Sequence, residues 1–101
     1  MSVNAIVSSD NKTVLLKISG RFDFSIHNDF RNAYKSVDFR NVEYVIDLVN
    51  TEYLDSSALG MLLLLKEYAD ETGSNVVINN ANQEILEILK IASFDKLFTI
   101  N

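Results

Sequence analysis

The fold of this chain is decided by residues 44–73, which read YVIDLVNTEYLDSSALGMLLLLKEYADETG. The first six of these residues are nearly continuous β-prone apolar sequence, which is typical of a strand buried on both faces. From Ser56 to Thr72 the apolar residues recur at helical spacing, and Gly73 is a good left-handed cap for the helix end. A buried strand that leads into a helix predicts an α/β fold with a largely parallel sheet.

The segments before and after this unit continue the alternation. Residues 3–8 and 13–18 predict two short strands, which the polar turn Asp10-Asn11 joins into a hairpin. The remaining predicted elements are a helix over 26–37 with Ser25 as its N-cap, a strand over 76–78, a helix capped by Asn82 and a strand over 97–100. The order β-β-α-β-α-β-α-β predicts one domain over residues 1–101, with a mixed, mostly parallel sheet flanked by three main helices.

Composition and charge exclude several classes of protein. The 101 residues are 48% hydrophobic and 23% charged, which is the balance of a folded domain rather than of a disordered chain. A net charge of -5 lacks the basic surface that binds nucleic acids or anionic membranes. The chain has no cysteine and no signal-peptide pattern, and its longest aliphatic run, 61–65, is far shorter than the ~20 residues of a membrane span. We therefore expect a cytoplasmic protein without nucleic-acid or membrane partners.

The charged residues and glycines form no ligand-binding motif. The acidic residues lack the spacing of a metal-binding loop, and the three glycines do not form a phosphate-binding loop. We therefore expect neither a metal nor a cofactor. Asp47 is unusual because it interrupts the apolar strand, and we expect it to lie near the strand end or to accept backbone hydrogen bonds.

Residues 53–61, YLDSSALGM, are the stretch most informative about function. They follow a buried strand and open a helix, the position at which open α/β sheets usually bind their ligands. The residue chemistry leaves two interpretations open. In the first, Asp55 or Ser56 is only the N-cap of the helix, and in the second the segment carries a function. Local chemistry by itself favours the first.

Resemblance to a known family changes this balance. The stretch LDSSALG over residues 54–60 resembles the D-S-[ST]-G-L-G signature of the anti-sigma factor antagonists (anti-anti-sigma factors), which are members of the STAS family. Residues 20–23, GRFD, resemble the G-x-[LF]-D turn of that family, and residues 93–98, SFDKLF, resemble its closing G-L-x-x-x-[FI] segment. The similarity covers nearly the whole chain in the order and spacing of the elements. The serine motif is specific, whereas the other two motifs are weak on their own.

The resemblance implies a non-enzymatic bacterial regulator of transcription that works by partner switching. In that family the serine directly after the aspartate is phosphorylated by an anti-sigma factor that is also a GHKL-type serine kinase. A metal-dependent serine phosphatase restores the serine. Carried over, Ser56 is the phosphorylation site and Ser57 its unmodified neighbour. The unphosphorylated protein would bind the anti-sigma factor and free the sigma factor, and phosphorylation would release the anti-sigma factor.

Two positions depart from the family pattern. Ala58 stands where many members have glycine, and Ser93 stands where the closing glycine is common. Neither change removes a hydroxyl or an acid, so we expect the switch to work. We expect the Ala58 methyl to lie beside the phosphorylation site and to affect which kinase fits.

The second helix carries more apolar residues than packing on a sheet requires. Leu59 and Leu63 project onto a polar side that they share with Lys66 and Glu67. They either form a ridge that docks on the partner or are covered by a neighbouring helix, and both interpretations stay open. The expected partner-binding residues are Asp23, which the resemblance places beside the serine loop, and Asp55, Ser57, Ala58, Leu59, Gly60 and Leu63.

Two rival functions belong to other classes. A serine hydrolase would need His27, the only histidine, as the base for Ser56. Because Asp55 directly precedes Ser56 and no G-x-S-x-G elbow exists, we expect a surface histidine instead. The second rival is a STAS scaffold or ligand-binding accessory module that phosphorylation does not control, as in anion-transporter tails or stress complexes. The absence of membrane spans from the sequence argues against the transporter version.

Overall fold

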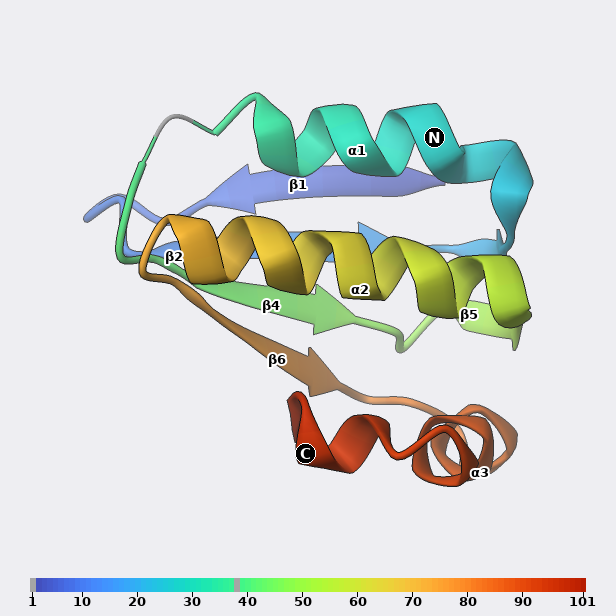
Figure 1. Ribbon diagram of the computed structural model, residues 1–101. Coiled ribbons are helices and arrows are strands. Elements are labelled where there is room, and N and C mark those ends of the chain that lie inside the picture. Colours follow the sequence, from blue (N-terminus) through green and yellow to red (C-terminus); the bar gives the residue numbers. More distant parts are fainter. Residues whose placement is uncertain (1, 38) are drawn as a thin grey trace.

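The computed structural model describes residues 2–37 and 39–101 of the chain. Its elements, in chain order, are β1 (Val3–Val7), β2 (Thr13–Ile18), β3 (Gly20–Phe22), the 3-10 turn η1 (Phe24–Ile26), α1 (His27–Lys35), β4 (Glu43–Asp47), β5 (Thr51–Leu54), α2 (Ser56–Glu71), β6 (Asn75–Asn79), α3 (Gln83–Ile91), the 3-10 turn η2 (Phe94–Lys96) and β7 (Thr99–Ile100). Five strands form one sheet in the order β1-β2-β4-β6-β7 (Figure 1). β1 is antiparallel to β2, and all other neighbours are parallel. The predicted α/β class with a mixed, mostly parallel sheet is confirmed.

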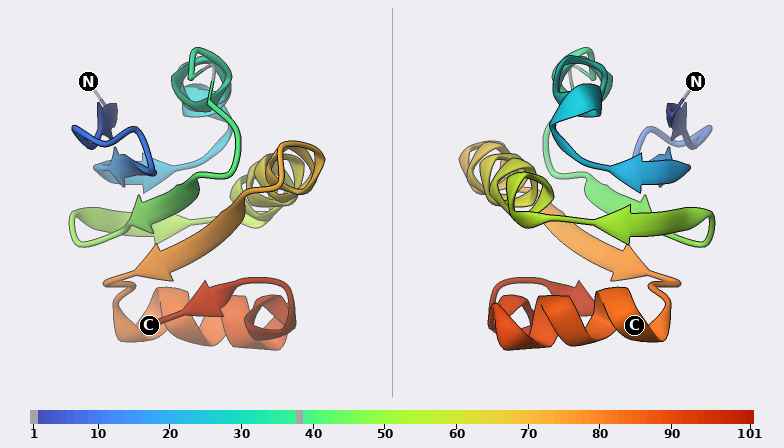
Figure 2. Two further views of the ribbon diagram at one scale, coloured as in Figure 1. Left: turned by 90° about the vertical axis from the view of Figure 1, so that its left-hand side faces the viewer. Right: turned by 90° about the vertical axis from the view of Figure 1, so that its right-hand side faces the viewer.

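The hydrophobic core lies between this sheet and the helices α1 and α2, which cover the same face (Figure 2). Alternate residues of β2 point into the core, as the sequence pattern predicts, because Val14, Leu16 and Ile18 are each 1% exposed or less. In the parallel register Val14 lies opposite Tyr44 and Leu16 opposite Ile46, so the inward residues of neighbouring strands form continuous rows. α3 lies beyond β6, next to the C-terminal segment (Figure 2).

Strand β4 is buried on one face only, so the prediction that residues 44–49 are buried on both faces is wrong. The inward side chains of β4 are fully buried, whereas Val45 and Asp47 on the opposite face are only partly buried. The strand ends at Asp47, and Val49 beyond it is 57% exposed. The physical reason is that α1 and α2 both pack on one face of the sheet and leave the other face incompletely covered (Figure 2).

The side chain of Asp47 shapes the turn that follows β4. One carboxylate oxygen accepts a hydrogen bond from the N–H of Val49 at 3.1 Å and another from the side-chain amide of Asn80 at 3.0 Å. The expectation that this acid lies at a strand end and accepts backbone hydrogen bonds is confirmed. The turn directs the chain into β5.

A second, two-stranded sheet pairs β3 with β5 and has no counterpart in the sequence-based prediction. The strands are parallel, with Gly20 opposite Thr51 and Phe22 opposite Leu54. Thr51 anchors β5 to the main sheet, because its buried hydroxyl donates a 2.7 Å hydrogen bond to the carbonyl of Ile18. With three and four residues, these strands are too short to show an alternating pattern.

The structure confirms two of the predicted helix caps and contradicts a third. Gly73 has φ +67° just after α2, and the side chain of Asn82 accepts a 2.9 Å hydrogen bond from the N–H of Ile85, so both of these caps are confirmed. The prediction that Ser25 caps the first helix is wrong. The turn η1 precedes α1, and the carboxylate of Asp23 caps η1 by accepting a hydrogen bond from the N–H of Ser25.

The C-terminal strand is shorter than the predicted range 97–100. Phe94 and Phe98 are buried with their ring centroids 5.2 Å apart, and they hold the turn η2 so that only two residues remain for β7. Ser93, immediately before η2, has φ +63°, which is left-handed backbone. Glycine adopts that conformation without steric cost, which explains why a glycine suits this position.

Candidate functional site

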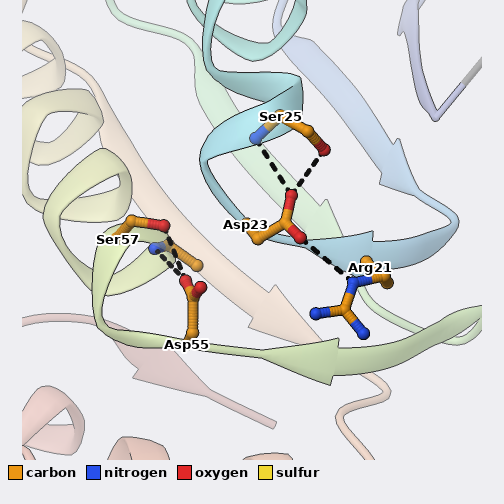
Figure 3. Close-up of polar contacts among 6 residues, drawn as sticks. Arg21, Asp23, Ser25, Asp55 and Ser57 are labelled. Atoms are coloured by element: carbon orange, nitrogen blue, oxygen red, sulfur yellow. Dashed lines mark hydrogen bonds and ion pairs between the residues drawn. The ribbon is translucent and has the colours of Figure 1, made fainter.

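The pairing of β3 with β5 brings two distant motifs together at one end of the molecule. Phe22 lies opposite Leu54, so Asp23 and Asp55, which follow these residues, leave the strand ends side by side (Figure 3). The structure therefore places Asp23 beside the start of the serine motif, residues 54–60, as expected. Since the two motifs are about thirty residues apart in sequence, only the β3–β5 pairing makes them neighbours.

Asp55 is the N-cap of α2, which decides between Asp55 and Ser56 for that role. One oxygen of its carboxylate accepts hydrogen bonds from the N–H of Ala58 at 3.2 Å and from the hydroxyl of Ser57 at 2.6 Å (Figure 3). Ser57 is partly buried and its hydroxyl is engaged in this contact, whereas Ser56 is exposed as the first residue of the helix. The two adjacent serines therefore differ in accessibility.

Asp23 is held by a network of its own. Its carboxylate accepts hydrogen bonds from the hydroxyl and the N–H of Ser25 and from Nε of Arg21, the last at 3.1 Å (Figure 3). These donors, with the Ser25 hydroxyl first, hold the pKa of Asp23 below its usual value. The guanidinium of Arg21 also lies over the ring of Tyr53, 4.2 Å from its centroid, and so links β3 to β5. The sequence reasoning missed Arg21 and Tyr53, whose contact depends on the unpredicted strand pairing.

Large apolar side chains are exposed on η1 and α2. Phe24 in η1 is 67% exposed and stacks on the ring of His27, with 4.8 Å between centroids. On α2, Leu63 is 41% exposed and Leu64 is 51% exposed. Sequence reasoning missed Phe24 and Leu64. Leu64 lies three residues after Met61, a helical spacing that is typical of inward residues. The sequence pattern therefore predicts a buried Leu64, which is misleading.

The residues predicted on α2 separate into three groups. Leu63 is exposed, as a docking ridge requires, whereas Leu59 is partly buried and packs against the core, so for Leu59 the alternative of a covered side chain holds. The Ala58 side chain is fully buried, so its methyl is not exposed to a kinase that reaches Ser56. Gly60 is exposed, and a Cβ built there would meet no heavy atom within 4 Å.

The described residues do not form the catalytic geometry of a serine hydrolase. Asp55 is engaged by Ser57 and Ala58, and the imidazole of His27 stacks on Phe24, so no Asp55–His27–Ser56 relay exists in residues 2–37 and 39–101. Within the same residues no group of three or more His, Asp or Glu side chains is arranged to hold a metal ion. No helix in this described part of the chain is long and apolar enough to span a membrane.

The sequence and the fold of this chain match those of known proteins. The family model "Mlab, STAS domain" matches residues 6–99. A STAS-domain containing protein of Pseudomonas aeruginosa (strain UCBPP-PA14) is 45% identical over 101 residues, which are 100% of both chains. The anti-sigma factor antagonist SpoIIAA of Bacillus, in its unphosphorylated form, has a TM-score of 0.71 at 11% identity, over 98% of this chain and 86% of that chain. A sulfate transporter family protein from Wolinella succinogenes has a TM-score of 0.76 at 12% identity, over 90% of this chain and 73% of that chain.

The two solved structures establish the fold, and they show that proteins with different descriptions share it. The family model covers most of the chain, and the Pseudomonas protein aligns with all of it. Together with the serine motif at the start of α2 and the Asp23 turn beside it, these matches identify the family. The chain belongs to the STAS domain family.

Proposed function

We propose that this protein is an anti-sigma factor antagonist that is switched by phosphorylation of Ser56. The observation that carries the proposal is the difference between the two serines: Ser56 is exposed at the N-terminus of α2, whereas the Ser57 hydroxyl is bonded to Asp55. A kinase can reach the first hydroxyl in the folded domain. To reach the second, it would have to break a hydrogen bond to a charged group, which is worth about 1.5–3 kcal/mol.

The family fold supports this reading. SpoIIAA, whose fold this chain shares, is known in an unphosphorylated and a phosphorylated form. The serine that follows the capping aspartate here matches the acceptor of the family signature that the chain resembles. Asp23 and Asp55 leave neighbouring strand ends and Ser56 directly follows Asp55, so a kinase that phosphorylates this serine would meet acidic side chains close to it.

A phosphate on Ser56 would alter binding more than folding. At the N-terminus of α2 the helix dipole contributes roughly 0.3–1 kcal/mol in favour of an anion, and the nearby Asp55 opposes that gain. Both effects are small against the ~5–15 kcal/mol that stabilises a typical domain. In a protein interface, however, about two added negative charges without a basic partner are strongly unfavourable. A loss of about 3–4 kcal/mol would lower the affinity by two to three orders of magnitude.

The partners follow from the same cycle. Unphosphorylated protein binds an anti-sigma factor that carries GHKL-type serine kinase activity, and the sigma factor is released. Phosphorylation of Ser56 ends this contact, and a metal-dependent serine phosphatase resets the protein. In this cycle the domain has no catalytic role. The protein acts as a cytoplasmic regulator of bacterial transcription.

The test uses two single variants and the wild-type protein. Ser56→Ala serves as bait for affinity capture, because it cannot be released by phosphorylation, and mass spectrometry identifies the bound kinase. That kinase, purified, should label wild type and Ser57→Ala but not Ser56→Ala, and phosphopeptide mapping should place the label on Ser56. A main label on Ser57 would overturn the site assignment. Calorimetric titration that gave equal affinities for unmodified and phosphorylated protein would favour the scaffold or accessory function instead.

A further inference from the structure

A groove of about 310 Å³ runs between α1 and α2 on the outer side of the helical layer. The two helices lie next to each other and run in the same direction over the sheet (Figure 1). The groove is lined from α1 by His27, Arg31, Tyr34 and Lys35, and from α2 by Leu64, Glu67, Tyr68 and Glu71. It begins near the turn η1, where Phe24 stacks on His27, and extends toward the C-terminal ends of both helices.

The two rims of the groove carry opposite charges. Arg31 and Lys35 are spaced by four residues on α1, and Glu67 and Glu71 are spaced by four residues on α2, so each pair forms a row along one side. All four side chains are exposed. The ion pairs formed by the residues of known placement are Arg21–Asp23 and Lys66–Asp70, and neither crosses the groove. Within residues 2–37 and 39–101, neither row forms an ion pair.

The floor of the groove contains two tyrosine rings and a leucine side chain, and Nζ of Lys35 lies over the Tyr68 ring, 6.0 Å from its centroid. The rings of Tyr34 and Tyr68 lie 5.3 Å apart between centroids, and Tyr34 is buried while Tyr68 is only partly buried. Leu64 is 51% exposed although it sits between the two helices. An apolar strip between rows of opposite charge has the pattern of a helix-binding surface.

We propose that a second copy of this chain occupies the groove in a two-fold symmetric dimer whose axis runs along the groove. This axis places α1 of each copy over α2 of the other, with the helices parallel. The row Arg31 and Lys35 then faces Glu67 and Glu71 of the other copy, and symmetry repeats the contact. The Leu64 side chains and the tyrosine rings lie between these rows.

Charge complementarity selects this arrangement and this occupant. A two-fold axis across the groove would instead place the basic row on the basic row and the acidic row on the acidic row, which repel. The surface is complementary to itself only about an axis along the groove, and such self-complementarity is what an isologous dimer requires. Ser56 does not line the groove, so this inference stands apart from the proposed function.

The experiment is sedimentation equilibrium of the full chain at low ionic strength, from micromolar concentration to about 1 mM, a range that detects even weak association. The wild type should approach twice the monomer mass of 11.4 kDa. Arg31→Glu/Lys35→Glu and Glu67→Lys/Glu71→Lys should each weaken association at least tenfold. An equimolar mixture of the two double variants should restore a dimer, because their charges again complement each other.

The matched control is Lys12→Glu/Lys90→Glu, which changes the net charge as much as the first variant but at exposed lysines that do not line the groove. It should dimerise like the wild type. A wild-type protein that stays monomeric up to about 1 mM would overturn the proposal and leave the groove to a different protein. The proposal also fails if the charge-reversed variants dimerise like the wild type, or if their mixture remains monomeric.

Discussion

Replacing Thr51 by valine tests the contact that assembles the site. Valine has nearly the shape of threonine but lacks the hydroxyl that donates a 2.7 Å hydrogen bond to the carbonyl of Ile18. Because Thr51 is only 4% exposed, water cannot take the place of this donor without rearrangement. Loss of one partner of a buried hydrogen bond costs about 1–3 kcal/mol. We therefore expect Thr51→Val to lower the free energy of unfolding by about 2 kcal/mol, a value within that range.

The expected change is large enough to measure by urea denaturation followed by circular dichroism. With a slope of about 1–3 kcal/mol per molar urea for a small domain, the midpoint should fall by roughly 1 M without a change of slope. The melting temperature should fall by about 8–16 °C, since 1 kcal/mol corresponds to about 4–8 °C in a domain of up to 100 residues. The matched control is Thr99→Val, which removes the hydroxyl of an exposed strand threonine and should change stability by less than about 0.5 kcal/mol.

Two results would refute the reasoning. Thr51→Val with the stability of the wild type would show that the Thr51–Ile18 bond does not anchor β5. An equal loss for Thr99→Val would show that the effect belongs to threonine in any strand. If the anchor is real, the variant should also bind the proposed anti-sigma factor partner more weakly, because β5 carries Tyr53 and leads directly into Asp55.

Four further predictions concern the site itself. Ser56→Asp should bind the partner more weakly than Ser56→Ala but more strongly than phosphorylated protein, since a carboxylate has about half the charge of a phosphate; equal affinities in calorimetry would exclude control by charge. Leu63→Lys should weaken partner binding at least tenfold with little change in melting temperature, because Leu63 is 41% exposed, and a large drop in stability would instead place it in the core. Gly60→Ala should stabilise the domain against urea by up to about 1 kcal/mol, as alanine is the better helix former and its Cβ would meet open space, so destabilisation would contradict the structure. Because the pKa of Asp23 is lowered, this carboxylate stabilises the folded state at pH values above its pKa in the unfolded chain. The contribution is lost as the pH falls through its lower pKa in the folded protein. An NMR titration should find the Asp23 pKa below 3.8, and Ser25→Ala should raise it.

The sequence alone was sufficient for the elements whose length shows a period. The alternation in β2 and the helical spacing in α2 predicted both elements, because burial of one face imposes a period of 2 on a strand and of 3.6 on a helix. Gly73 and Asn82 marked helix ends because a left-handed residue and a side-chain acceptor have local requirements. The resemblance to the family motif predicted Ser56 as the phosphorylation site.

Other predictions were wrong where the outcome depended on neighbours. The apolar strand 44–49 carries the same residues whether helices cover one face of the sheet or both, and here they cover one (Figure 2). For Leu59 the sequence left an exposed ridge and a covered position open, and the side chain packs against the core. Ala58 was expected to affect which kinase fits at Ser56, yet its methyl is fully buried. In each case the outcome depends on which element packs alongside, and the local pattern of residues does not show that.

What the sequence by itself determined is the α/β class, the order of the long elements and the motif at the start of α2, all of which arise from local periodicity and local chemistry. Only the tertiary structure decided that Asp23 and Asp55 stand side by side, that Arg21 lies on Tyr53, and that Ser56 rather than Ser57 is free. The first two of these features depend on the pairing of β3 with β5, two strands too short to show a period, whereas Ser57 is engaged by a local hydrogen bond to Asp55. The pairing forms because the buried Thr51 hydroxyl and the rest of the sheet hold β5 in place, and such long-range contacts leave no mark in any single stretch of sequence.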